Sequence, residues 1–126
     1  MAAGKYNFVI EQGTTLDFDV EYKDSTNTAI DLSDYTARMQ IKDKIGGSTT
    51  YITLSSSLTP DNTGLNFEEA SSGKIKVFIS ANSSSALNFN KAVYDLEIAS
   101  GSTYPVVTRL LQGNVTLDKE VTTGGY

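Results

Sequence analysis

The sequence predicts an all-β protein, an antiparallel β-sandwich of seven to eight short strands. Apolar and polar residues alternate along most of the chain, which is the pattern of strands with one buried face. Turn residues separate these segments at intervals of roughly 10 to 15 residues, the spacing typical of sandwiches. Neither a long helical pattern nor an internal repeat interrupts the series. A small closed barrel is the alternative, because it also buries alternating faces.

The first half of the chain contains four predicted strands. They cover residues 6–10, 16–22, 35–41 and 50–54, each with apolar side chains at every second position. Residues 30–35 precede the third strand and read as a corner, since Asp and Ser favour bends by bonding local backbone. Tyr35 ends this segment, and we expect it to anchor the corner to the core.

The second half adds two shorter strand patterns, a helical turn and a hairpin. Residues 65–67 and 74–79 are predicted strands, the second of them strongly apolar. Residues 81–87 lack alternation, and Ser80 precedes them as a capping residue, so we expect one helical turn near 81–87.

The closing hairpin is the most regular part of the sequence. Along its first arm Tyr94, Leu96 and Ile98 share one face, with Asp95 and Glu97 on the other. A turn at Gly101–Ser102 leads into the second arm, residues 106–117. The apolar parity of this arm changes near Gly113, which predicts a β-bulge or a bend there.

Length indicates one domain. A chain of 126 residues and 13.6 kDa buries a hydrophobic core without help from metals or disulfides. We therefore expect a single β-sandwich domain over residues 1–126. Residues 1–5 and 118–126 lack core-forming periodicity and are expected to be flexible ends that become ordered on docking.

The composition argues against an enzyme. The chain has neither cysteine nor histidine, which excludes disulfides, thiolate metal sites, the Ser-His-Asp triad and most zinc sites. Serine and threonine are abundant, but none lies in a recognisable nucleophile motif. We expect no catalytic residue, no metal, no cofactor and no small-molecule substrate.

Charge and hydropathy limit the classes of partner. A formal net charge of −5 and a pI near 4.5 disfavour nucleic acid and anionic membranes, because such partners repel an acidic surface. The sequence has no apolar run of the roughly 18 residues that a membrane span needs, and its start lacks the pattern of a signal peptide. We expect a protein that is made and used in a cytosol.

Two sets of residues are candidates for a contact or a structural role. Arg109 interrupts an apolar stretch opposite Asp95 and Glu97, where it forms either a cross-strand ion pair or a subunit contact. The possible interface residues are Arg109, Leu111, Tyr104 and Tyr126, and the possible structural corners are Tyr94 and Tyr35. Tyr94 matches the "tyrosine corner" of many sandwiches, in which the hydroxyl bonds back to the backbone.

Two other patterns have a ligand-binding interpretation and a simpler one. Asp17, Asp19 and Glu21 project from one side of a strand and resemble calcium ligands, but such rows are more often solvated faces that discourage aggregation. The tyrosines would provide a sugar-stacking platform, but without tryptophan their strand positions better suit a core.

Four segments resemble small structural proteins of tailed bacteriophages. They are residues 3–15, with Ile10-Glu11-Gln12-Gly13, and then residues 30–41, 94–98 and 107–116. Their order and spacing resemble the immunoglobulin-like N-terminal domain of phage upper baseplate proteins, over nearly the whole chain. Baseplate proteins of that type carry further domains after the sandwich, whereas this chain stops at Tyr126, which favours a small connector or decorating subunit.

The resemblance implies an immunoglobulin-like sandwich that serves as a non-enzymatic subunit of a virion, in the tail, baseplate or neck. It implies that multiple copies dock with other virion proteins in a symmetric assembly, made and assembled in the host bacterial cytoplasm. A capsid decoration protein and a host-surface glycan-binding module are the alternatives.

Overall fold

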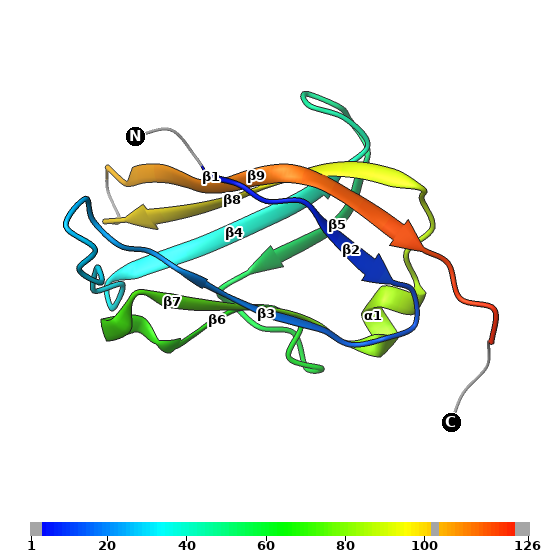
Figure 1. Cartoon of the computed structure of the whole chain (residues 1–126), viewed down its shortest axis with the longest axis horizontal. Coiled ribbons are helices and arrows are strands. Elements are labelled where there is room, and N and C mark those ends of the chain that lie inside the picture. Colours follow the sequence, from blue (N-terminus) through cyan, green and yellow to red (C-terminus); the bar gives the residue numbers. More distant parts are fainter. Residues whose placement is uncertain (1–3, 102–103, 123–126) are drawn as a thin grey trace.

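The computed structural model describes residues 4–101 and 104–122, which form two β-sheets packed face to face (Figure 1). The larger sheet has the strand order β1-β9-β8-β4-β5, with β2 also pairing with β9. Its strands are β1 (Gly4–Lys5), β2 (Phe8–Glu11), β4 (Tyr35–Lys42), β5 (Thr50–Ser55), β8 (Lys91–Ser100) and β9 (Val106–Asp118). The smaller sheet has the order β3-β7-β6. Its strands are β3 (Leu16–Glu21), β6 (Gly64–Glu69) and β7 (Lys74–Ile79).

These strands confirm the predicted all-β sandwich, with one difference at the start of the chain. The predicted strand over residues 6–10 is replaced by β1 and β2, so the described residues contain nine strands. Both pair with β9 in parallel, while every other strand pair is antiparallel. The chain bends between them, where the Tyr6 N–H donates to the Gln112 carbonyl at 3.0 Å.

The core lies between the two sheets and takes its side chains from the predicted apolar faces. Among the described residues twenty apolar side chains are buried, and β7 supplies Ile75, Val77 and Ile79 with no exposed surface. The predicted faces of the hairpin are confirmed, because Tyr94, Leu96 and Ile98 are buried while Asp95 and Glu97 lie on the opposite side of β8. Alternation thus identified which side of each strand faces inward.

The predicted helical turn is confirmed as α1 (Ala81–Ser85). Ser80 caps it by accepting a 3.0 Å hydrogen bond from the Ser83 N–H. Ser84 is fully buried, and its hydroxyl donates to the Thr14 carbonyl at 2.7 Å. The turn therefore ties the loop after β2 to the end of the sandwich. A short 3-10 helix, η1 (Ala70–Ser72), links β6 to β7.

The parity change in β9 lies earlier than predicted. The β8–β9 register shifts between the pairs Leu96–Leu111 and Glu97–Arg109, leaving Leu110 as the extra residue. The bulge is thus at Leu110 and not at Gly113. Gly113 has a different physical role, because a Cβ at this position would lie 2.2 Å from the Tyr6 carbonyl oxygen. Only a glycine lets the N-terminal segment cross β9 this closely.

Hydrogen bonds hold both ends of the described part of the chain. Gly4 and Lys5 form β1, and the Asp118 carbonyl accepts a 2.8 Å hydrogen bond from the Gln12 N–H. The Glu120 N–H donates to the Gln12 side-chain oxygen at 3.1 Å. Residues 1–3, 102–103 and 123–126, which include part of the predicted hairpin turn, lie outside the described residues. Within the described ranges, none of the helices has the length and hydropathy that a membrane crossing requires.

Candidate functional site

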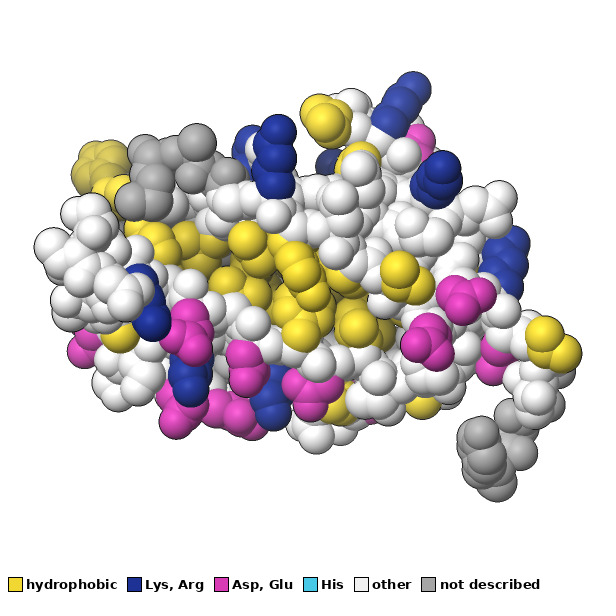
Figure 2. Space-filling model, in the orientation of Figure 1, with side chains coloured by type: hydrophobic (Ala, Val, Ile, Leu, Met, Phe, Trp, Pro, Cys, Tyr) yellow, Lys and Arg dark blue, Asp and Glu magenta, His cyan; other side chains and the backbone are white. Residues whose placement is uncertain are grey.

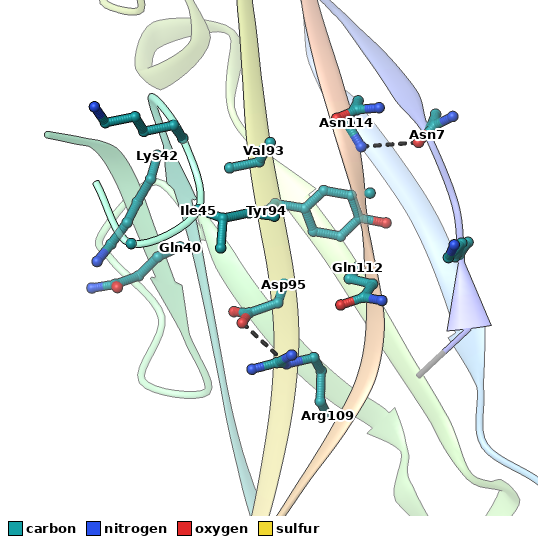
Figure 3. A pocket seen from close by; sticks show the side chains of 14 residues that line it. Asn7, Gln40, Lys42, Ile45, Val93, Tyr94, Asp95, Arg109, Gln112 and Asn114 are labelled. Carbon is teal, nitrogen blue, oxygen red and sulfur yellow. Dashed lines mark hydrogen bonds and ion pairs between the residues drawn. The ribbon is translucent and has the colours of Figure 1, made fainter. Parts of the chain in front are cut away.

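Arg109 and Asp95 form an ion pair on the outer face of the larger sheet (Figure 3). The Arg109 Nε lies 3.3 Å from an Asp95 carboxylate oxygen, although the backbone register sets Arg109 opposite Glu97. Glu97 instead pairs with Arg38 of β4 at 2.9 Å. The structure therefore brings Arg109 to one of the two acids expected from the sequence, and Arg38 takes the other. Both pairs are accessible to water, so each adds about 0–1 kcal/mol to stability.

A shallow hollow of about 600 Å³ lies beside this ion pair. Its floor is the outer face of β4, β8 and β9, and the loop between β4 and β5 forms one wall. The lining includes four amide side chains (Asn7, Gln40, Gln112 and Asn114), four cations (Lys5, Lys42, Lys44 and Arg109) and one carboxylate, Asp95. This surface is therefore positively charged in a chain with a net negative charge.

The hollow is built by residues that point outward from neighbouring strands. Asp95 and Gln112 are register partners across β8 and β9, and Gln40 is the partner of Asp95 across β4. At the far rim, the Asn7 side-chain oxygen accepts a 2.9 Å hydrogen bond from the Asn114 N–H. Such a surface recognises partners through hydrogen bonds and charge. Sequence reasoning missed these amides, although the outward parity of their strands was a usable signal.

The hairpin end adjoining this face carries exposed apolar side chains. Tyr104 is 90% exposed, Val106 66% and Val107 50%. The predicted interface residue Tyr104 is thus on the surface, and the two valines beside it were not among the predicted interface residues. Both valines are exposed, although they are adjacent in β9 and point to opposite sides of the strand. Leu111 is half-buried and packs against the core, and Tyr126 lies outside the described residues.

Tyr94 has a structural role that differs from the tyrosine corner. Its hydroxyl donates a 2.6 Å hydrogen bond to the Tyr6 carbonyl, 88 residues earlier in the chain, whereas a tyrosine corner bonds to backbone a few residues upstream. The ring packs edge-on against Phe8, with ring centroids 4.9 Å apart. Burial, with a further contribution from Tyr6, raises the pKa of Tyr94 to about 12, so the hydroxyl keeps its proton.

The corner before β4 depends on Leu32 more than on Tyr35. Leu32 is buried, and its N–H donates to the Ala70 carbonyl at 2.8 Å. Asp31 shapes the bend by accepting a 3.0 Å hydrogen bond from the Ser33 N–H, as expected for such a residue. Tyr35 begins β4 and packs against the core as a partly buried side chain.

The acidic row Asp17, Asp19 and Glu21 lies on the outer face of β3. Asp17 is 3.8 Å from the Lys76 ammonium, and Glu21 is 3.3 Å from Lys23. Over residues 4–101 and 104–122, no group of three or more acidic side chains has the geometry of a metal site.

Comparison with known proteins identifies the fold. No protein-family model matches this chain, and no curated protein matches it. Among solved structures, a marsupial T cell receptor is similar, with a TM-score of 0.51 and 15% sequence identity. The alignment covers 91% of this chain and 34% of that one, so the chain spans about a third of its length. At this identity the likeness shows the fold alone, an immunoglobulin-like β-sandwich.

The strand order agrees with that assignment. The larger sheet has the immunoglobulin order G-F-C-C′ in β9, β8, β4 and β5, and the smaller sheet has the order B-E-D in β3, β7 and β6. The inter-sheet disulfide and tryptophan of antibody domains are absent from the sequence. In the core of this chain, aromatic packing joins β2, β3 and β8, with Phe8 next to Phe18 at 5.2 Å and next to Tyr94.

Proposed function

We propose that this chain is a non-enzymatic structural subunit of a bacteriophage virion, located in the tail, baseplate or neck, which acts through protein–protein assembly. The observation that carries this proposal is the apolar end of the β8–β9 hairpin, where Tyr104, Val106 and Val107 are exposed together. Clustered apolar side chains on a surface favour contact with another protein, and tyrosine is enriched at the energetic centres of interfaces.

The four segments that resemble phage structural proteins support the same function. Two of them, residues 94–98 and 107–116, form the hairpin that carries the exposed end. Arg109 lies on the outer face of this hairpin, where arginine suits a polar rim around an apolar contact. In a symmetric particle each such contact is repeated, so individually weak contacts between copies and other virion proteins hold the subunit in place. The subunit would be made and assembled in the host bacterial cytoplasm.

Incorporation into particles tests this proposal. The chain with Tyr104→Ser and Val106→Thr is expressed in place of the natural one in a phage that encodes it, and purified particles are probed with an antibody. We expect the variant to fold normally and to be lost from particles, because only exposed side chains change. Ile45→Ser is the matched control, since Ile45 is 91% exposed on a different loop.

Two outcomes contradict the proposal. Normal incorporation of the double variant would show that the hairpin end is not the contact. Absence of the natural chain from purified particles would show that the protein is not a virion subunit. Imaging of the labelled subunit then separates tail, baseplate and neck from the alternative of a capsid decoration protein, which would cover the capsid surface in a much higher copy number.

The hollow on the larger sheet favours a second candidate, a host-surface glycan-binding module. Amides and cations hydrogen-bond sugar hydroxyls and acidic sugar groups, and the lining contains four of each. A glycan array with the purified protein tests it, with Gln40→Ala and Gln112→Ala as variants that should weaken any signal. An array without binding removes this candidate and leaves the assembly proposal unaffected.

A further inference from the structure

Strand β3 forms an edge of the smaller sheet, and its inward side chains are incompletely covered. The sheet order is β3-β7-β6, so only β7 pairs with β3 among the described residues. The inward residues Leu16, Phe18 and Val20 are all partly exposed. The corresponding residues of β7, in the same sheet, have no exposed surface. The inward side chains of β3 are therefore less completely covered than those of β7.

A groove lies beside the C-terminal end of β3. It has a volume of about 260 Å³ and separates β3 from β1 and β9. Its apolar lining comes from Val20, Tyr22, Leu110 and Leu111, and the charged residues Glu21, Lys23 and Arg109 also line it. Figure 2 shows hydrophobic side chains across the middle of this view of the molecule, with acidic and basic side chains below them.

The backbone of β3 has hydrogen-bonding groups directed to this free edge. The Tyr22 N–H donates to the Gly73 carbonyl at 2.7 Å, on the β7 side. Because successive residues of a strand point their N–H and C=O groups to opposite sides, Val20, Phe18 and Leu16 also face β7. The N–H and C=O groups of Asp17, Asp19 and Glu21 therefore point to the open edge.

Immunoglobulin-like sandwiches of the constant type have four strands in this sheet, with the first strand beside B. In this chain the N-terminal strands β1 and β2 pair with β9 of the other sheet. The position beside β3, which corresponds to B, is therefore open among the described residues.

We propose that β3 accepts an added strand from a protein partner, namely an extended segment in which apolar residues alternate with lysine or arginine. A strand added beside β3 places alternate side chains against the partly exposed inward residues of β3 and into the groove at its end, and the others beside Asp17, Asp19 and Glu21. The outer face of the smaller sheet bears five carboxylates (Asp17, Asp19, Glu21, Glu68 and Glu69) against three lysines (Lys74, Lys76 and, just beyond β3, Lys23). Cations on the added strand complement this excess of negative charge.

The same charges select against self-pairing through this edge. Two copies that met at β3 would place their acidic rows side by side, which is unfavourable. The acidic row therefore disfavours pairing with β3 of a second copy and favours pairing with a basic segment. This interaction uses a different edge from the hairpin end and does not depend on the virion proposal.

Amide hydrogen exchange of the full chain, with and without a synthetic peptide, tests the proposal. The peptide has about eight residues alternating lysine and valine, enough to span β3. In the free protein we expect Asp17, Asp19 and Glu21 amides to exchange faster than those of Phe18 and Val20. With the peptide, the three acidic-residue amides should slow while the others stay unchanged.

Matched peptides and variants separate strand addition from simple charge attraction. A peptide with glutamate in place of lysine should not bind. N-methylation of the peptide amides on the edge that pairs with β3 should abolish binding, whereas methylation on its other edge should not. Asp19→Pro removes an outward N–H and should weaken binding about tenfold or more, whereas Asp19→Asn keeps the N–H and should weaken it less.

Three results overturn the proposal. The first is unchanged exchange of the Asp17, Asp19 and Glu21 amides at saturating lysine peptide. The second is equal binding of the lysine and glutamate peptides, which removes charge as the selector. The third is slow exchange of these amides in the protein alone together with a dimeric mass, which identifies a second copy of the chain as the occupant. If Asp19→Pro fails to fold, the methylated peptides still decide between these results.

Discussion

The Tyr94 hydroxyl donates a hydrogen bond to the Tyr6 backbone carbonyl at 2.6 Å, linking the central strand β8 to the N-terminal segment. The bond lies at the bend between β1 and β2, where the chain crosses β9. A phenol buried at this depth would lose a hydrogen bond to water on folding, and Tyr6 replaces it. The interaction therefore fixes where the N-terminal segment joins the larger sheet.

Tyr94→Phe should lower the free energy of unfolding by about 1 kcal/mol, because the variant keeps the ring packing against Phe8 and loses only the hydrogen bond. Denaturant unfolding measures this loss. Tyr51→Phe is the control, since Tyr51 contributes a ring stacked on Phe89 at 4.6 Å. We expect its effect to be within about 0.5 kcal/mol. Equal effects of the two substitutions would show that the Tyr94 hydroxyl adds nothing specific.

The raised pKa of Tyr94, about 12, predicts a loss of stability in strong alkali. Burial disfavours the phenolate, so the contribution of Tyr94 is complete below its unfolded pKa of about 10 and is lost as the pH rises from there through about 12. The natural chain should therefore lose stability more steeply over this range than Tyr94→Phe. Unfolding at pH 9, 10 and 11 gives the comparison, and identical slopes would contradict the assignment.

Gly113→Ala should destabilise the crossing of the N-terminal segment. An added Cβ would lie 2.2 Å from the Tyr6 carbonyl oxygen and 2.8 Å from the Asn7 side-chain oxygen. The backbone must shift to remove this clash, so we expect the free energy of unfolding to fall by about 1–3 kcal/mol. Gly4→Ala is a milder control, because its nearest neighbour is a Leu111 side-chain carbon at 3.3 Å. A variant at Gly113 as stable as the natural chain would mean that this crossing is loosely held.

Local alternation predicted most of the fold because it reports which face of a strand is buried. It placed Ile75, Val77 and Ile79 inward without any knowledge of their partners. It could not predict that Gly4 and Lys5 pair in parallel with β9, because a two-residue strand has no period to detect. The bulge was predicted near Gly113 instead of at Leu110 for a related reason. Parity changes between two adjacent leucines, and sequence alone does not show which of them is unpaired.

The candidate site was less predictable than the fold, because it depends on register between distant strands. Gln40, Asp95 and Gln112 become neighbours only once β4, β8 and β9 are aligned, and no local pattern fixes that alignment. Arg109 and Asp95 were expected to be close because both lie in one hairpin, where the turn limits the registers available. Partners within a hairpin are thus easier to predict than partners across a sheet.

Asp61 should make the stability of the chain depend on acid. Its carboxylate accepts hydrogen bonds from the Thr59 hydroxyl, the Thr63 N–H and the Ser80 and Ser83 hydroxyls, joining the β5–β6 loop to α1. The Ser80 and Thr59 hydroxyls, in that order, hold the pKa of Asp61 far below its usual range. This contribution is present above the unfolded pKa of about 4 and is lost as the pH falls below it.

Urea unfolding of the natural chain and Asp61→Asn at pH 7, 4 and 3 measures this dependence. We expect the variant to be less stable at pH 7 and the difference to narrow below pH 4. Asp43→Asn is the matched control, because Asp43 Oδ1 has no hydrogen-bond partner among the described residues. A difference between Asp61→Asn and the natural chain that stays constant across this range would contradict the role of the carboxylate charge.

Leu32→Ala should cost about 2–5 kcal/mol, the usual result of removing a large side chain from a packed core. Leu32 is 1% exposed and lies at the corner that leads into β4. Ile45→Ala, at a residue that is 91% exposed, should leave the free energy of unfolding nearly unchanged. A small loss of stability in Leu32→Ala would mean that the corner moves to fill the cavity. The hydrogen bond from the residue 32 N–H to the Ala70 carbonyl should then break, and faster hydrogen exchange of this amide would detect it.

A double-mutant cycle at Arg109 and Asp95 separates the stability of the hairpin from its proposed docking. The ion pair is 3.3 Å long, but the two side chains are 52% and 39% exposed, so solvent screens their attraction. Arg109→Ala, Asp95→Ala and the double variant should give a coupling energy of about 0.2–1 kcal/mol in denaturant unfolding. Because the fold barely depends on this pair, loss of Arg109→Ala from particles would report on assembly. A coupling well above that range would make Arg109 a stabilising residue of the sheet and leave Tyr104 as the cleaner probe of the interface.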